Sequence, residues 1–253
     1  MLETMALAYA HRGLFKDRLT ILVPKQATQA IAPLLTAHQA QHKLKWISKS
    51  NKPQDNSNDA FPIVQTVFRA CLARHNPNAT PKPVAKLNQQ TTTSPRILLC
   101  CWRSKVDPEE KLWAHLRSLG LKTILKLYQR LTPVVSKLNL QIIDLTRYEA
   151  SEIQALNQTV AFQLTLPGAA IKSFLDTSRF FGPNTMVASI DTSLVHLACW
   201  YHQAPIVLAH KYKDGRWLQH FWNDVLILEQ QQLHNWDHPI DRLIERIENH
   251  LWH

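Results

Sequence analysis

Three consecutive polar residues, Asp191, Thr192 and Ser193, stand between an apolar run and a stretch with helical spacing. Asp, Thr and Ser are favoured at helix N-termini, where free backbone N–H groups and the positive end of the helix dipole also bind phosphates. In open α/β sheets such a turn lies outside the carboxyl end of a parallel strand. The residue types and their order therefore predict a site for a phosphate or pyrophosphate.

The elements around this turn form a β-turn-α-β unit. Residues 186–190 (MVASI) have the composition of a buried strand, residues 194–202 have helical spacing, and residues 205–209 are typical of the next strand. His196 lies one turn into the expected helix, near the same anion. In the alternative interpretation Asp191 and Thr192 only cap the helix, and His196 is a core histidine with satisfied hydrogen bonds.

Strands and helices alternate on both sides of a polar segment at 76–95, which contains prolines 77, 81, 83 and 95 and predicts a linker. Before the linker we expect strands and helices at these positions: strands 19–23 and 44–47, helices 2–11, 28–41 and 61–74. After it we expect further strands 96–102, 122–128 and 141–145 and helices 109–119, 132–138, 168–180 and 237–250. The predicted fold class is α/β with two Rossmann-like domains: an incomplete N-terminal one (1–75), the linker (76–95) and a C-terminal one (96–253).

The overall composition is that of a globular protein with an anionic partner. The 253 residues include no apolar run near 18 residues and no charged-then-apolar leader, so we expect a cytoplasmic protein. The formal charge of +10 favours a phosphorylated ligand, nucleic acid or an anionic membrane surface. No zinc-finger, RNP or helix-turn-helix pattern is present, so no specific nucleic-acid binding is expected. The cysteines (Cys71, Cys100, Cys101 and Cys199) lack metal-ligand spacing, so we expect them reduced and buried.

Residues 96–225 resemble the C-terminal, donor-binding half of the family nine glycosyltransferases, which are related to ADP-heptose:lipopolysaccharide heptosyltransferases and have the GT-B fold. The resemblance is carried by RILLCCWRSK, EEKLWAHLRSLGL, LQIIDLT and SIDTSLVHLACWYHQAPIVLA. The family motif D-T-x-x-x-H-L-A, followed by a proline-led strand, stands here as Asp191, Thr192, His196, Leu197, Ala198 and Pro205. The later residues 214–217 (DGRW) resemble a block seen in some members.

The resemblance implies a role for each candidate residue. Asp191 would orient the donor sugar, and Thr192 and Ser193 would donate hydrogen bonds to the diphosphate, near His196. Lys111, which precedes Trp113 as in the family, would stabilise charge on the departing diphosphate. The remaining cleft residues implied are Arg103 and Ser104. Alternatively, Lys111 is a solvated helix residue balancing two glutamates, and residues 107–110 are only a helix start.

The resemblance also implies an inverting, metal-independent transfer of a hexose or heptose, without cofactor or metal, from a nucleotide-sugar to a glycan or lipid-linked acceptor. The charge allows a peripheral contact with the inner face of the membrane. Two features depart from the family: Ser193 replaces a glycine, and the first strand and its acidic loop, which carry the catalytic base, are expected to be missing. Glu3 is the one acidic residue in 1–12, and the base is therefore unassigned.

Two other readings remain open. In one, the chain is a catalytically degenerate GT-B-like protein that binds a nucleotide or a partner without turnover. In the other, ALAYAHRGLF is a tetratricopeptide-like helix; this reading is weaker, because LTILVP continues as a strand where the repeat needs a second helix.

Overall fold

The computed structural model describes residues 19–24, 44–49, 95–104, 111–201, 203–212 and 224–250. Two strands are described before the predicted linker: β1 (Leu19–Pro24) and β2 (Leu44–Lys49). They pair in parallel, with Leu19 opposite Leu44. Both strands were predicted, each one or two residues shorter. The helices predicted before the linker, and the linker itself up to residue 94, lie outside the described residues.

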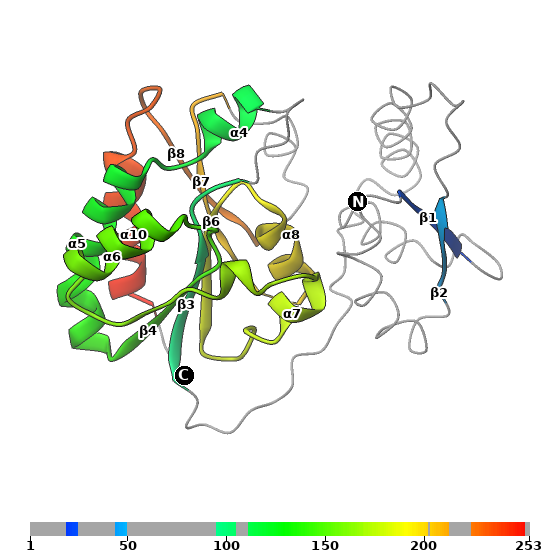
Figure 1. Cartoon of the computed structure of the whole chain (residues 1–253), viewed down its shortest axis with the longest axis horizontal. Coiled ribbons are helices and arrows are strands. Elements are labelled where there is room, and N and C mark those ends of the chain that lie inside the picture. The colour runs from blue at the N-terminus through cyan, green and yellow to red at the C-terminus, as the bar shows by residue number, and fades with distance from the viewer. Residues whose placement is uncertain are drawn as a thin grey trace.

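Residues 95–250 contain a six-stranded sheet in which every strand pair is parallel (Figure 1). Its strands are β3 (Arg96–Cys101), β4 (Leu140–Asp144), β5 (Leu164–Thr165), β6 (Thr185–Ile190), β7 (Ile206–Ala209) and β8 (Leu226–Glu229). They lie in the order β5-β4-β3-β6-β7-β8, so the chain builds outward from β3 on one side and then outward from β6 on the other. This is the strand order of a doubly wound, Rossmann-like sheet. The predicted α/β class is confirmed for this region, and the paired-domain arrangement stays a prediction.

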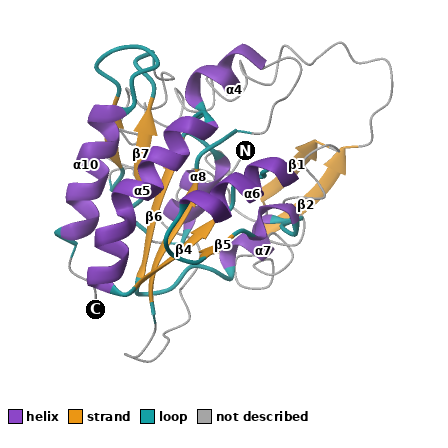
Figure 2. Cartoon of the chain, turned by 60° about the vertical axis from the view of Figure 1, so that its left-hand side comes forward, coloured by secondary structure: helices purple, strands orange, loops and turns teal. Residues whose placement is uncertain are grey.

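Helices cover both faces of this sheet (Figures 1 and 2). They are α4 (Lys111–Arg117), α5 (Leu121–Leu138), α6 (Ala150–Thr159), the 3-10 turn η4 (Pro167–Ala169), α7 (Phe174–Ser178), α8 (Ser193–Trp200) and α10 (Asp237–Glu248). One apolar core joins α5, α6 and α10 to the sheet, and a second core lies between the sheet and α8. The sheet is therefore the middle layer of three.

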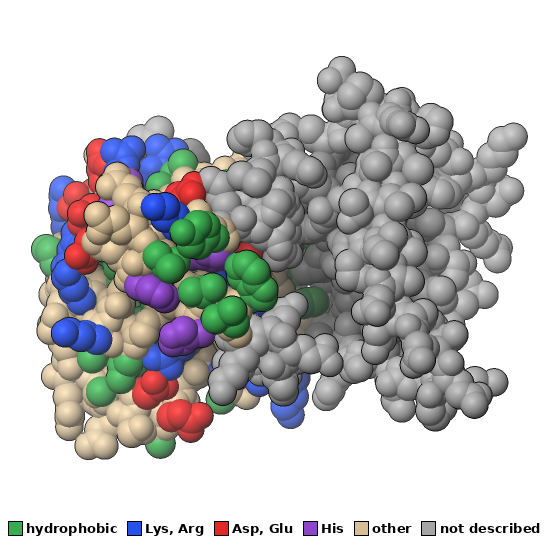
Figure 3. All heavy atoms as spheres, turned by 90° about the horizontal axis from the view of Figure 1, so that it is seen from above, with side chains coloured by type: hydrophobic (Ala, Val, Ile, Leu, Met, Phe, Trp, Pro, Cys, Tyr) green, Lys and Arg blue, Asp and Glu red, His purple; other side chains and the backbone are tan. Residues whose placement is uncertain are grey.

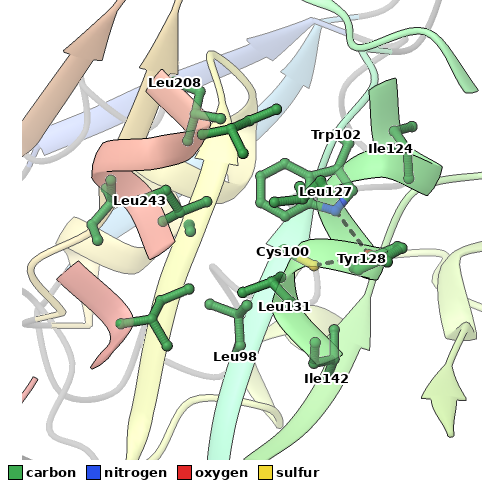
Figure 4. Close-up of a cluster of buried hydrophobic side chains, with 14 of the residues drawn as sticks. Leu98, Cys100, Trp102, Ile124, Leu127, Tyr128, Leu131, Ile142, Leu208 and Leu243 are labelled. Carbon is green, nitrogen blue, oxygen red and sulfur yellow. Dashed lines mark hydrogen bonds between the residues drawn. The ribbon is translucent and has the colours of Figure 1, made fainter. Parts of the chain in front are cut away.

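The strand β3 contributes to both cores because side chains alternate along a strand. Leu98 and Cys100 are fully buried in the core with α5, as Figure 4 shows, whereas Leu99 belongs to the core with α8. Cys101 packs against the second core, on the face opposite Cys100. Cys100, Cys101 and Cys199 are free thiols, as predicted, and Cys100 and Cys199 are buried. Cys71 lies outside the described residues.

The strand predicted at 122–128 is wrong, because these residues form the first half of α5. Over six residues TILKLY resembles a β-branched strand. Over eighteen residues, however, the buried side chains recur every three or four positions, at Ile124, Leu127, Tyr128, Leu131, Val134 and Val135. Burial of this continuous stripe favours the helix despite Pro133 inside it. Gly120, predicted to close the preceding helix, stands instead at the N-cap of α5.

The other element boundaries differ less. The helix predicted at 168–180 is only the short α7, preceded by η4, and the strands β5 and β8 were not predicted. β5 has two residues and β8 four, too few for a periodic pattern to be visible. The strands β3, β4, β6 and β7 and the helix α8 lie where the sequence predicts them, within one or two residues.

The amphipathic helix predicted at 237–250 is confirmed as α10, with Ile240, Leu243 and Ile247 fully buried. It lies beside α5, and two ion pairs join the helices: Lys126 with Asp237 (2.6 Å) and Arg130 with Asp241. Within the described part of the chain, no helix has the length and apolar character needed to cross a bilayer.

Candidate anion site at the sheet switch point

The carboxyl ends of β3 and β6 lie side by side where the sheet changes direction. The register pairs Cys101 at the end of β3 with Ser189 near the end of β6. From β3 the chain leads to β4 on one side, and from β6 it leads to β7 on the other. In doubly wound sheets a crevice forms outside the carboxyl ends at this point, because the two connections diverge to opposite faces. Five of the seven predicted site residues follow these two strand ends: Arg103, Ser104, Asp191, Thr192 and Ser193.

The turn from β6 into α8 has the geometry of an anion site. Thr192 is the N-cap of α8, with extended backbone, and its hydroxyl lies 2.9 Å from that of Ser189. Its side chain forms no capping hydrogen bond to the helix. Ser193, the first helical residue, is exposed, whereas Asp191 is 7% exposed. The capping alternative therefore does not account for Thr192, whose side chain leaves the first-turn N–H groups of α8 uncapped.

The ends of β3 and β6 are joined by hydrogen bonds. The Ser189 hydroxyl donates to the carbonyl of Cys101 (2.8 Å), and the Cys101 thiol donates to the carbonyl of Arg103 (3.3 Å). Burial raises the pKa of Cys101 to about 12, and the nearby charge of Asp144 raises it further against hydrogen bonds that lower it. Cys101 is thus a neutral thiol at the floor of the crevice, without the thiolate character that a nucleophile needs.

Arg103 is held by the protein on the β4 side. Its Nη1 donates to Glu152 (2.7 Å), its Nε donates to the carbonyl of Leu119 (3.2 Å), and its guanidinium lies 5.5 Å from the centre of the Tyr148 ring. Partial burial raises the pKa of Glu152, but hydrogen bonds from Arg103 and from the backbone of Glu149 lower it below its usual value. Arg103 is therefore a wall of the crevice whose charge is already paired.

Ser104 is likewise held from one side. Its backbone N–H donates to the hydroxyl of Ser118 (3.0 Å), and its own hydroxyl accepts a bond from Nη2 of Arg117 (2.8 Å). Ser118 and Arg117 come from the end of α4 and the turn after it. The segment after β3 is thus fixed against α4, which brings the short helix over the carboxyl edge of the sheet.

A buried carboxylate that the sequence interpretation did not single out stabilises this wall. Asp144, at the end of β4, is fully buried and accepts hydrogen bonds from the hydroxyls of Tyr128 (2.6 Å) and Tyr148 (2.6 Å) and from the N–H of Thr146 (2.8 Å). Burial raises the pKa of Asp144, although these hydrogen bonds lower it. The Tyr128 hydroxyl also accepts a bond from the indole N–H of Trp102 (2.8 Å), drawn in Figure 4. A polar residue directly after an apolar strand run was the available signal.

The remaining predicted residues fall in different places. His196 is buried on α8, which matches the core alternative, and its role beside a ligand stays a prediction. The backbone of Lys111 begins α4, but its side chain is not among those described; Trp113, two residues later, is half exposed. Glu3 and the block at 214–217 lie outside the described residues.

Within the described ranges, no group of three or more His, Cys, Asp or Glu side chains is arranged to hold a metal ion. No protein-family model, no curated protein and no solved structure matches this chain. What the fold and site define is therefore a Rossmann-like α/β unit with an uncapped helix N-terminus at its switch point.

Proposed function

We propose that this protein is a glycosyltransferase that binds the diphosphate of a nucleotide-sugar at the N-terminus of α8 and transfers the sugar to a glycan or lipid-linked acceptor. One observation carries the proposal: α8 begins at the switch point with Ser193 exposed and the Thr192 hydroxyl bonded to Ser189 instead of capping the helix. An anion at that position receives the first-turn N–H groups and the positive end of the helix dipole.

Charge and sequence resemblance narrow the ligand. A net charge of +10 favours a polyanion over a neutral metabolite. The D-T-x-x-x-H-L-A pattern, with Asp191 and Thr192 at this turn, resembles the donor-binding half of the family nine glycosyltransferases. We therefore propose a diphosphate-sugar instead of a dinucleotide, with Thr192 and Ser193 at the diphosphate and Asp191 orienting the sugar.

The proposed chemistry depends on stabilising a leaving group. As the glycosidic bond to the diphosphate breaks, negative charge grows on the phosphate oxygens, and preorganised N–H donors stabilise that charge. Lys111 is proposed to add a positive charge at the same place. No metal or cofactor is needed in this scheme.

An inverting transfer also needs a general base for the acceptor hydroxyl. Of the described carboxylates on the β3/β4 wall, Asp144 is fully buried between two tyrosines and Glu152 is paired with Arg103. Neither is placed to take a proton from an acceptor. We propose that the base comes from the region before the linker, which would form the acceptor domain of a GT-B pair and meet a lipid-linked acceptor at the cytoplasmic face of the membrane.

Calorimetric titration with ADP, GDP, UDP and their sugar conjugates tests the binding step. The most informative variant is Ser193→Asp, because a carboxylate in the first turn suits the helix dipole but repels a diphosphate. We expect Ser193→Asp to keep the parent's melting temperature and to lose at least tenfold in diphosphate affinity. Asp191→Ala with Thr192→Ala should also weaken binding of the diphosphate-sugar.

Gln141→Glu is the matched control, because it adds one negative charge at the exposed start of β4, on the opposite edge of the sheet. This variant should bind like the parent. Absence of diphosphate binding by the parent, or equal binding by Ser193→Asp and the parent, refutes the site. Binding without transfer of radiolabelled sugar to a membrane-lipid extract identifies the degenerate, non-catalytic alternative.

A further inference from the structure

We infer that a second subsite, for the pyranose ring of the donor, lies at the carboxyl ends of β7 and β8, one strand away from the proposed anion site. This inference rests on the proposed function and adds to it the position and the recognition of the sugar. Figure 3 looks onto this edge of the sheet, where hydrophobic and histidine side chains gather on the surface of the described region. Its residues are Trp113, His210, Tyr212 and Gln230, called here the aromatic platform.

The platform joins an exposed indole to the end of β7. Trp113 on α4 is 52% exposed, and its ring centre lies 6.0 Å from that of His210, the residue directly after β7. Tyr212, two residues further, is 60% exposed, and its N–H donates to Nδ1 of His210 (3.2 Å). Large aromatic side chains are normally buried, so two of them exposed beside the same buried histidine indicate a surface that binds something.

A buried amide provides an independent second observation. Gln230 follows β8 and is 2% exposed; its N–H donates to the carbonyl of Ala209 (2.9 Å), and its side-chain oxygen accepts from the N–H of Lys211 (3.4 Å). The amide therefore reaches across to the end of β7, beside His210. Its Nε2 has no hydrogen-bond partner among the described residues. Buried donors are almost always paired, so this one needs an acceptor.

A pyranose ring fits both observations. One of its faces carries apolar C–H groups, which pack on the electron-rich face of an indole, and its rim carries hydroxyls, which accept hydrogen bonds from an amide. A diphosphate at α8 has a nucleoside at one end and a sugar at the other. The β3/β4 side is closed by the paired Arg103 and the buried Asp144, whereas the β7 side offers an exposed ring and an unused donor. The sugar is therefore assigned to the β7 side.

The test compares the affinities for nucleoside diphosphates with those for the matching diphosphate-sugars. The probes are UDP with UDP-glucose, ADP with ADP-glucose, and GDP with GDP-mannose. In the parent we expect at least one sugar conjugate to bind about tenfold more tightly than its diphosphate. Trp113→Ala should remove that advantage and leave the diphosphate affinity unchanged, and Trp113→Phe should restore part of it. Leu112→Ala is the control, because its neighbouring side chain on α4 is still more exposed (67%).

The outcomes separate this inference from the proposed function. If the parent binds diphosphates without any advantage for a sugar, or if Trp113→Ala weakens the diphosphate and the conjugate equally, the platform is not a sugar site and the anion site still stands. Saturation-transfer NMR with methyl β-glucopyranoside examines the platform without a nucleotide. A sugar signal that Trp113→Ala abolishes, in a protein that binds no diphosphate, would support the platform and refute the proposed function.

Discussion

The two sides of the switch point are built in opposite ways. On the β3/β4 side, Asp144 is fully buried and its carboxylate accepts bonds from two tyrosines and one backbone N–H, while Arg103 is paired with Glu152. On the β6/β7 side, Ser193 is exposed at a helix N-terminus without a side-chain cap, and the amide nitrogen of Gln230 lacks a partner among the described residues. Polar groups on the first side are satisfied within the protein, and those on the second side leave donors for a ligand.

This contrast teaches where stability and binding reside. A fully satisfied buried network makes one arrangement of the chain much more favourable than others, because breaking any bond leaves a buried group unpaired. An uncapped helix end is a small loss of stability that bound phosphate recovers. Substitutions on the β3/β4 side should therefore change unfolding, and substitutions on the β6/β7 side should change ligand affinity.

The largest effect is expected for Asp144→Ala. Removal of the carboxylate leaves the hydroxyls of Tyr128 and Tyr148 and the N–H of Thr146 without their acceptor, and each buried unsatisfied group costs about 1–3 kcal/mol. We expect a loss of about 3 kcal/mol or more in the free energy of unfolding, measured by urea denaturation. Asp241→Ala, which breaks only the surface pair with Arg130, should cost less than about 1 kcal/mol. Equal losses in the two variants would contradict the network.

Gly168→Ala should have the next largest effect. A Cβ at Gly168 would lie 2.5 Å from the carbonyl oxygens of Leu145 and Thr146, the backbone that follows β4. Overpacking against backbone costs about 1–3 kcal/mol. Gly120 is the control, because a Cβ there meets nothing within 4 Å and its φ of −69° suits alanine. Gly120→Ala should therefore be neutral or stabilising by up to about 1 kcal/mol. Thermal denaturation of both variants gives the comparison.

Tyr128→Phe and Thr192→Ala compare one hydroxyl from each side. Loss of the Tyr128 hydroxyl removes a donor from Asp144 and an acceptor from the Trp102 indole, for an expected cost of about 1–3 kcal/mol in unfolding free energy. Loss of the Thr192 hydroxyl removes one contact with Ser189 and should cost about 1 kcal/mol. In diphosphate titrations the order should reverse, with Thr192→Ala weakened and Tyr128→Phe unchanged. The same order in both measurements would remove the distinction between the two sides.

The smallest effect is a pH dependence of the Arg103–Glu152 pair. The pKa of Glu152 is lowered in the folded protein, so its contribution to stability is present above its ordinary value of 4.5 and is lost as the pH falls through the lowered value. Asp144 opposes this trend, because burial raises its pKa and its contribution is lost as the pH rises. Glu152→Gln should be less stable than the parent by about 1 kcal/mol at pH 7, and this gap should close by pH 3.

Urea denaturation between pH 3 and 7 measures that gap. Glu248→Gln, at an exposed position at the end of α10, should leave the pH profile unchanged. A gap for Glu152→Gln that stays constant with pH would show that the charge of Glu152 contributes nothing to the wall.

The sequence predicted the elements that carry long or strongly apolar patterns. MVASI, RILLCC and PIVLA are strands buried on both faces, and DHPIDRLIERIE is an amphipathic helix, so burial and periodicity agree locally with the final structure. The stretch at 122–128 failed because six residues carry two periods at once, and only packing of eighteen residues against the sheet selects the helix. β5 and β8 were missed because pairing with a neighbouring strand, not composition, makes them strands.

The candidate site divides in the same way. By themselves, the residues Asp191, Thr192 and Ser193 determined that a polar turn follows a buried strand and begins a helix, since capping residues and strand composition are local properties. Only the tertiary structure decided that this turn meets the end of β3, that Arg103 is spent on Glu152, and that Trp113 lies beside His210 at the end of β7. The order of parallel strands sets these neighbours, because it brings together residues that are up to about a hundred positions apart in the chain.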